Sequence, residues 1–176
     1  MTLGELRPGD VLAYRPNSHI AFRALGFAQT LAGISDPKYA HVGIISRIAP
    51  QWTWVEEASA YTDAGVAIAP KYPWPCAVLR FSGLDLAAAL KYFNRHDRYP
   101  YGFRALGPMG LIRKMGFRSF GLPKWTGWEH VCSPLVTAML RAGGVDPFPG
   151  LHTSLAMPAD FAEAQGCEVV GDWSPT

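Results

Sequence analysis

The stretch Val131-Cys132-Ser133-Pro134-Leu135-Val136 decides the fold, because it marks the start of a helix and puts a thiol there. Ser133 followed by Pro134 matches the pattern of a helix N-cap with proline in the first helical position. Apolar residues then recur at helical spacing until Gly143-Gly144, which is typical of a helix C-terminus. We therefore predict a helix that has Cys132 at its N-terminus.

Short runs rich in valine and isoleucine, bounded by glycine and proline, surround this helix and predict an antiparallel sheet. Strands are expected at Val11 to Tyr14, His41 to Ile48, Trp52 to Ala58, Val66 to Ala69, Ala77 to Phe81 and Glu168 to Val170. Further helices are expected from Ile20 to about Gly33, from Leu84 to Phe93 and from Pro158 toward Gln165, with a long functional loop from Tyr99 to Trp128. The sequence predicts one α+β domain, residues 1–176, whose sheet packs against the Cys132 helix.

Length and charge exclude several classes of protein. The chain has 176 residues and a net charge of +2, so it lacks the basic surplus of a nucleic-acid-binding protein. No apolar run is long enough for a transmembrane segment, and we find no signal peptide. The 3 widely spaced cysteines suit reduced thiols. We expect a cytoplasmic protein, with delivery to the outside by lysis or a phage-like route as the alternative.

Cys132 is the strongest candidate for chemistry, because unpaired amides and the helix dipole favour a thiolate at a helix N-terminus. A buried cysteine that only packs is the competing interpretation. His41, at the start of a predicted strand, is the expected general base, and His130 and His152 are alternatives. Glu57 or its neighbour Glu56 is expected to orient the imidazole, and the two must point to opposite faces of their strand.

We predict neither a metal nor a cofactor. His130-x-Cys132 together with Cys76, His152 and Cys167 offers possible ligands, but the chain has no closely spaced pair of the CxxC or HExxH kind. Nor does a phosphate-binding loop occur. Among the many aromatic residues, we assign Tyr14, Tyr101 and Trp128 to substrate binding.

Five motifs in order resemble the circularly permuted papain-like hydrolases of the NlpC/YiiX type, in which the histidine strand precedes the cysteine helix. They are Leu6-Arg7-Pro8-Gly9-Asp10-Val11-Leu12, Ala40-His41-Val42-Gly43-Ile44-Ile45, Val55-Glu56-Glu57-Ala58, Val131-Cys132-Ser133-Pro134-Leu135-Val136 and Met157-Pro158-Ala159-Asp160-Phe161. The stretch from Tyr99 to Phe103 is similar to the tyrosine-rich stretch that precedes the cysteine in this group. Two positions depart from the pattern: Ala40 stands where a serine often precedes the histidine, and Pro134 replaces a frequent acidic residue.

The resemblance implies that Cys132 is the nucleophile, His41 the general base and then acid, and Glu57 the orienting residue. It implies an amidase or peptidase that works through an acyl-enzyme on peptide, amide or lipid-like substrates. A thiol acyltransferase or lipid-directed hydrolase of the same fold is one alternative, and a non-catalytic binding module is another. Residues 103–122 mix basic and apolar side chains, which also suggests contact with a membrane surface. A loop that packs its aromatics over the core is the competing interpretation of that segment.

Overall fold

The described strands form a single antiparallel sheet in the order β4-β3-β2-β1-β5-β6. In the computed structural model, residues 5–16, 20–35, 37–49, 52–58, 62–67, 75–96 and 100–173 are described. The strands are β1 (Val11–Tyr14), β2 (His41–Ala49), β3 (Trp52–Ala58), β4 (Thr62–Ala67), β5 (Cys76–Phe81) and β6 (Cys167–Trp173). The expected antiparallel sheet is confirmed. β6 is longer than expected and β4 begins earlier; Ala69, placed in the fourth strand, lies outside the described residues.

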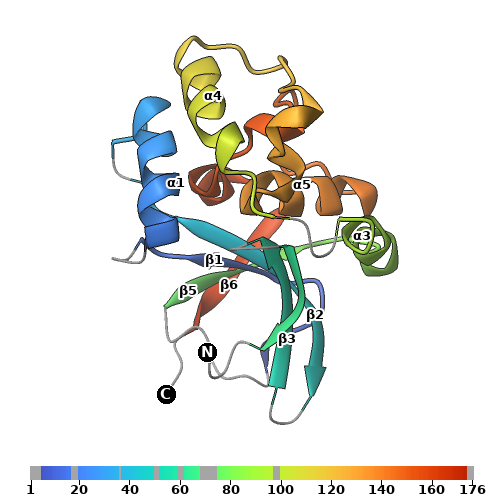
Figure 1. Ribbon diagram of the computed structural model, residues 1–176. Helices are drawn as coiled ribbons and strands as arrows, with labels where there is room; N and C mark the ends of the chain where they lie inside the picture. The colour runs from blue at the N-terminus through green and yellow to red at the C-terminus, as the bar shows by residue number, and fades with distance from the viewer. Residues whose placement is uncertain are drawn as a thin grey trace.

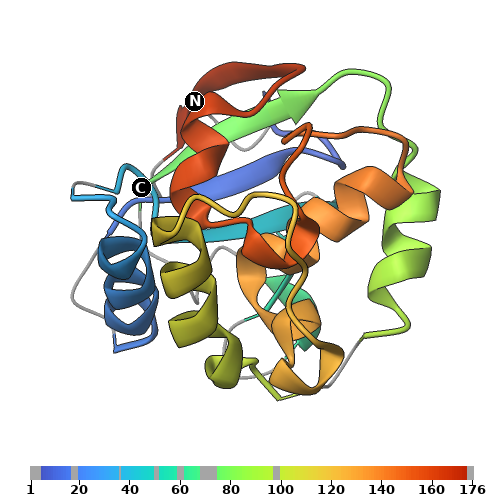
Figure 2. The same ribbon diagram turned by 90° about the horizontal axis from the view of Figure 1, so that it is seen from above.

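Helices lie over one face of this sheet, which gives the α+β arrangement of Figure 1. They are α1 (Ile20–Leu31), α3 (Leu86–Phe93), α4 (Phe103–Lys114) and α5 (Cys132–Ala142), with short 3-10 turns η2 (Lys124–Thr126), η3 (Trp128–His130), η4 (Thr153–Leu155) and η5 (Pro158–Glu163). Seen from above, α1 and α4 stand side by side at one edge of the helical layer, and α5 crosses its centre (Figure 2). No helix in the described ranges is long and apolar enough to cross a membrane.

The two faces of the sheet bury different clusters, because successive side chains of a strand point to opposite faces. Val42 and Ile44 belong to the core under the helices, which also contains Cys132. Tyr14 and Ile45 belong to a second, smaller cluster on the other face. α5 packs directly against β2 and β3, and so the helix that begins with Cys132 rests on the strand that begins with His41.

The predicted N-cap of α5 is wrong by two residues. Val131, in an extended conformation, is the N-cap residue, and Cys132 is the first helical residue. The hydroxyl of Ser133 instead donates a buried hydrogen bond of 2.8 Å to the carbonyl of Ala156. Ser133 therefore ties α5 to the segment that precedes η5, and the thiol belongs to the first helical turn.

Two other boundaries differ from the expectation. α3 begins at Leu86 instead of Leu84, because Asp85 is its N-cap and accepts a hydrogen bond from the amide of Ala88. The long loop that we expected from Tyr99 to Trp128 contains the helix α4. Glycine and proline inside α4 hid it, because these residues have the lowest helix propensities.

Candidate functional site

Cys132 occupies the positive end of α5. The first turn of a helix has amide groups without intrahelical acceptors, and the helix dipole adds to their effect on a nearby negative charge. No side chain caps this turn within the described residues, and Pro134 contributes no amide hydrogen. The amides of Cys132 and Ser133 belong to this first turn and have no acceptor within the helix. The side chain itself is 0% exposed and belongs to the helix-side core.

The hydroxyl of Tyr101 is the polar group that contacts the sulfur, at 3.9 Å from Sγ. Tyr101 is itself buried and precedes α4 directly. Its position is fixed by a close backbone crossing: a Cβ on Gly102 would lie 1.9 Å from the carbonyl oxygen of Gly127. The amide of Gly102 also donates to the carbonyl of His130, at 3.3 Å. The structure thus brings Tyr101, one of the expected substrate-binding residues, to Cys132, the candidate nucleophile.

His41 is the first residue of β2, as predicted, and is buried. It lies opposite Tyr14 in the register of β1 and β2, and the two rings are 5.5 Å apart between centroids. Tyr14 belongs to the cluster on the sheet face away from the helices, whereas Cys132 belongs to the helix-side core. The structure therefore brings His41 to Tyr14 and Cys132 to Tyr101, while the pairing of His41 with Cys132 stays a prediction.

The two candidate orienting residues lie beside β2. Glu56 is opposite Ile44, and Glu57 is opposite Gly43. Glu56 is largely buried, a position that a carboxylate occupies only with polar partners. The side chain of Glu57 lies outside the described part of the structure. Which of the two would orient His41 stays open.

The alternative bases, His130 and His152, lie within and beside the segment that precedes Cys132. The ring of Trp128, the third expected substrate-binding residue, meets His152 edge-on with 6.0 Å between ring centroids. Burial lowers the pKa of His152, and the charge of Arg141 lowers it further. Burial also lowers the pKa of His130, helped by the neighbouring His96. Both histidines thus favour the neutral form, which accepts protons.

Burial makes Cys76 and Cys167 poor candidates for a thiolate nucleophile. Burial, with the charge of Asp172, raises the pKa of Cys76 to about 12. Burial also raises the pKa of Cys167, which lies in β6. All three cysteines are free, and no group of three His, Cys, Asp or Glu side chains in the described ranges is placed to hold a metal ion.

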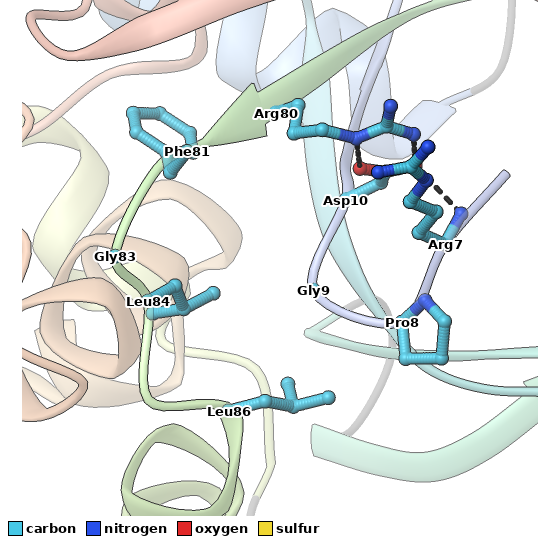
Figure 3. Close-up of a pocket in the computed structure, with 9 residues that line it drawn as sticks. All are labelled: Arg7, Pro8, Gly9, Asp10, Arg80, Phe81, Gly83, Leu84 and Leu86. Carbon is cyan, nitrogen blue, oxygen red and sulfur yellow. Dashed lines mark hydrogen bonds and ion pairs between the residues drawn. The ribbon is translucent and has the colours of Figure 1, made fainter.

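A separate pocket of about 200 Å³ lies between the N-terminal turn and the start of α3 (Figure 3). Figure 3 shows an apolar wall of Phe81, Leu84 and Leu86 opposite a polar wall that contains Asp10 and Arg80. Arg80 donates two hydrogen bonds of 2.8 Å to the buried carboxylate of Asp10, so the charges of the two side chains compensate each other. Sequence reasoning did not find this ion pair, because its partners are 70 residues apart.

The pocket is not the Cys132 site. Leu84 contacts the backbone at Gly143, and the amide of Asp85 donates to the carbonyl of Gly143. Gly143 is the C-cap of α5, whereas Cys132 is the first residue of that helix. The pocket therefore lies at the end of α5 opposite the thiol.

No protein-family model matches the chain, and no curated protein matches it significantly in sequence.

Proposed function

We propose that the chain is a cysteine-dependent hydrolase of amide or ester bonds, an amidase or peptidase with a permuted papain-like fold. Cys132 is the nucleophile, His41 the general base, and Glu57 or Glu56 the orienting residue. The observation that carries the proposal is the position of Cys132 in the first turn of α5, with its sulfur 3.9 Å from the Tyr101 hydroxyl. The order of the sequence motifs supports it.

The reaction has two steps. The sulfur of Cys132 attacks the substrate carbonyl carbon while His41 takes the thiol proton, and amides of the first helical turn stabilise the oxyanion. The carbonyl then reforms, the bond to the leaving amine or alcohol breaks, and His41 gives that group its proton. Water, deprotonated by His41, attacks the thioester and releases the acid and the free thiol. The Tyr101 hydroxyl is placed to hold the substrate carbonyl beside the sulfur.

Access to the sulfur has to be opened. Cys132 is fully buried, and Tyr101 covers it. The ring of Tyr101 in turn lies 4.6 Å, between centroids, from the ring of Phe103, which is half exposed. This series of contacts leads from the surface to the thiol, and we propose that the side chains of Phe103 and Tyr101 rotate to admit the substrate while the backbone stays fixed.

Alkylation kinetics test the proposal with the chain's own controls. Cys167 is more exposed than Cys132, so exposure alone predicts that iodoacetamide modifies Cys167 first. An activated nucleophile predicts the reverse: Cys132 reacts first near neutral pH, and His41→Ala slows it. Peptide mapping by mass spectrometry gives the rate at each thiol. If Cys167 reacts first and His41→Ala changes nothing, Cys132 is a packing residue and the chain a binding module.

A second candidate function is acyl transfer or hydrolysis directed at lipids. The exposed phenylalanine beside Tyr101 favours it, because an acyl chain would meet an apolar surface on the way to the thiol. The two functions differ in the acyl group that Cys132 carries after incubation with peptide and lipid mixtures. A peptidyl adduct identifies the amidase, and a fatty acyl adduct identifies the lipid-directed enzyme.

A further inference from the structure

Among the side chains that the structure describes, the exposed apolar ones are concentrated in one region. Large hydrophobic residues that are more than half exposed comprise Phe27, Phe103, Leu111, Met115, Phe117, Phe120 and Val169. All except Val169 belong to α1, to α4 or to the segment that follows α4. We call residues 20–35 and 100–128 the α1–α4 lobe. In Figure 1 this lobe rises from the helical layer, and the segment after α4 forms its end farthest from the sheet.

The same lobe is basic throughout. It holds six of the 16 lysine and arginine residues of the chain and none of the 14 acidic residues. Arg113 pairs with Asp160, at 2.8 Å, and Lys124 with Glu129, at 3.4 Å. The other basic side chains are exposed and have no ion-pair partner in the described part of the chain: Arg23, Arg104, Lys114 and Arg118. A surface of this kind is complementary to a negatively charged, partly apolar partner.

Apolar and basic side chains meet most closely in residues 111–120, which we call the tip segment. Leu111 and Met115 are one helical turn apart, and Phe117 and Phe120 follow. Lys114 and Arg118 alternate with them. An amphipathic helix of a globular protein normally turns its apolar residues inward. α4 buries Ala105, Leu106 and Met109 in this way and still exposes Phe103 and Leu111.

The backbone around the tip segment is anchored, so these side chains are held outward. The carbonyl of Arg118 accepts a hydrogen bond of 2.7 Å from the amide of His152. The amide of Leu122 donates to the hydroxyl of Ser154, at 2.8 Å. The Arg113–Asp160 pair fixes the last turn of α4. A fixed apolar surface that faces water is typical of a binding surface.

We propose that the α1–α4 lobe docks on the surface of a lipid bilayer that contains anionic lipids. The tip segment inserts its apolar side chains at the boundary between head groups and acyl chains. Lys114 and Arg118 contact the anionic head groups. A protein partner is the weaker candidate, because unpaired basic side chains surround this apolar surface. The inference is independent of the chemistry at Cys132.

Vesicle flotation tests the proposal. The protein is mixed with vesicles of phosphatidylcholine alone or with about 30% phosphatidylglycerol, at low and high salt. The wild-type protein should float with the anionic vesicles, and high salt should weaken its binding. Phe117→Ser/Phe120→Ser should lower the partition coefficient by about tenfold or more, because two large apolar side chains no longer insert into the bilayer. Lys114→Gln/Arg118→Gln should lower it ~25-fold on anionic vesicles only.

Matched controls lie on other surfaces. Val169→Ser removes an equally exposed apolar side chain from β6, and Lys91→Gln removes an exposed charge from α3. Both should bind like the wild type, and circular dichroism should show that all variants are folded. Failure of the wild type to float with anionic vesicles overturns the proposal. Loss of binding in the controls as well as in the tip variants overturns it too. A wild-type dimer in sedimentation that Phe117→Ser/Phe120→Ser converts to a monomer, without vesicle binding, identifies a second copy as the partner instead.

Discussion

The contact between α1 and α4 depends on Gly110, and replacing this glycine by alanine tests the helical packing quantitatively. A Cβ at this position would lie 2.6 Å from the carbonyl oxygen of Ala28 and 2.7 Å from the Cβ of Leu31, both on α1. Gly26, in α1, is the matched control, since a Cβ there meets nothing within 4 Å. The two substitutions are chemically identical and differ only in the space available.

The expected magnitudes follow from two opposing effects. Alanine stabilises a helix interior by ~1 kcal/mol relative to glycine, and at Gly26 nothing opposes this gain. At Gly110 the obstacle is largely backbone, which cannot rotate away, so α1 and α4 must separate. Overpacking of this kind costs ~1–3 kcal/mol, and we expect the upper end. Gly110→Ala should therefore lose ~2 kcal/mol of unfolding free energy, and the two variants should differ by ~3 kcal/mol.

Urea denaturation followed by tryptophan fluorescence gives the unfolding free energies, and thermal melts provide a second measure. For a chain of this size, ~1 kcal/mol corresponds to ~2–4 °C, so Gly110→Ala should lower Tm by ~4–8 °C and Gly26→Ala should raise it by ~2–4 °C. If Gly110→Ala is as stable as Gly26→Ala, α1 and α4 do not pack through Gly110 and the explanation is wrong.

Further predictions concern α5 and the histidines near it. Ser133→Ala should lower the unfolding free energy by ~1–3 kcal/mol, because the buried carbonyl of Ala156 loses its donor. Thr137→Val, on the same helix, should raise it by ~1 kcal/mol, because the Thr137 hydroxyl is buried without a partner in the described chain. A chemical denaturation series that shows the two variants equally stable would contradict this. Acid should also destabilise the fold, because the pKa values of His130 and His152 are lowered in the folded protein and the unfolded chain therefore binds protons more readily. The unfolding free energy should fall as the pH drops below about 6.5, by at most ~1.4 kcal/mol per pH unit for each histidine. Denaturation midpoints between pH 7.5 and 5.5 measure the slope, which His130→Gln should reduce; a stability that rises on acidification would refute the assignment.

The elements that sequence predicted well are those whose local pattern agrees with their tertiary environment. β2 is rich in β-branched residues and β3 in β-branched and aromatic ones, and their expected and observed bounds agree closely. α4 could not be predicted, because Gly107, Pro108 and Gly110 all weaken a helix locally. Gly110 is explained only by the close approach of α1, a contact between segments far apart in the chain.

The candidate site was predicted in part for the same reason. The position of Cys132 in the first turn of a helix follows from the Ser-Pro pattern beside it, even though the cap itself is Val131. The contact between Cys132 and Tyr101 depends on the crossing of Gly102 over Gly127, which no local pattern encodes. Sequence also could not show that the sulfur is closed to solvent, because burial depends on how the segment before α4 packs.

Trapping the acyl-enzyme tests the central claim most directly. The protein is incubated with mixed peptide and lipid acyl donors, quenched in acid, digested and mapped by mass spectrometry. We expect an acyl group on Cys132, absent in Cys132→Ser and strongly reduced in His41→Ala, with Cys76 and Cys167 unmodified. An adduct on Cys167 alone, or equal acylation of Cys132 in the wild type and in His41→Ala, would contradict it.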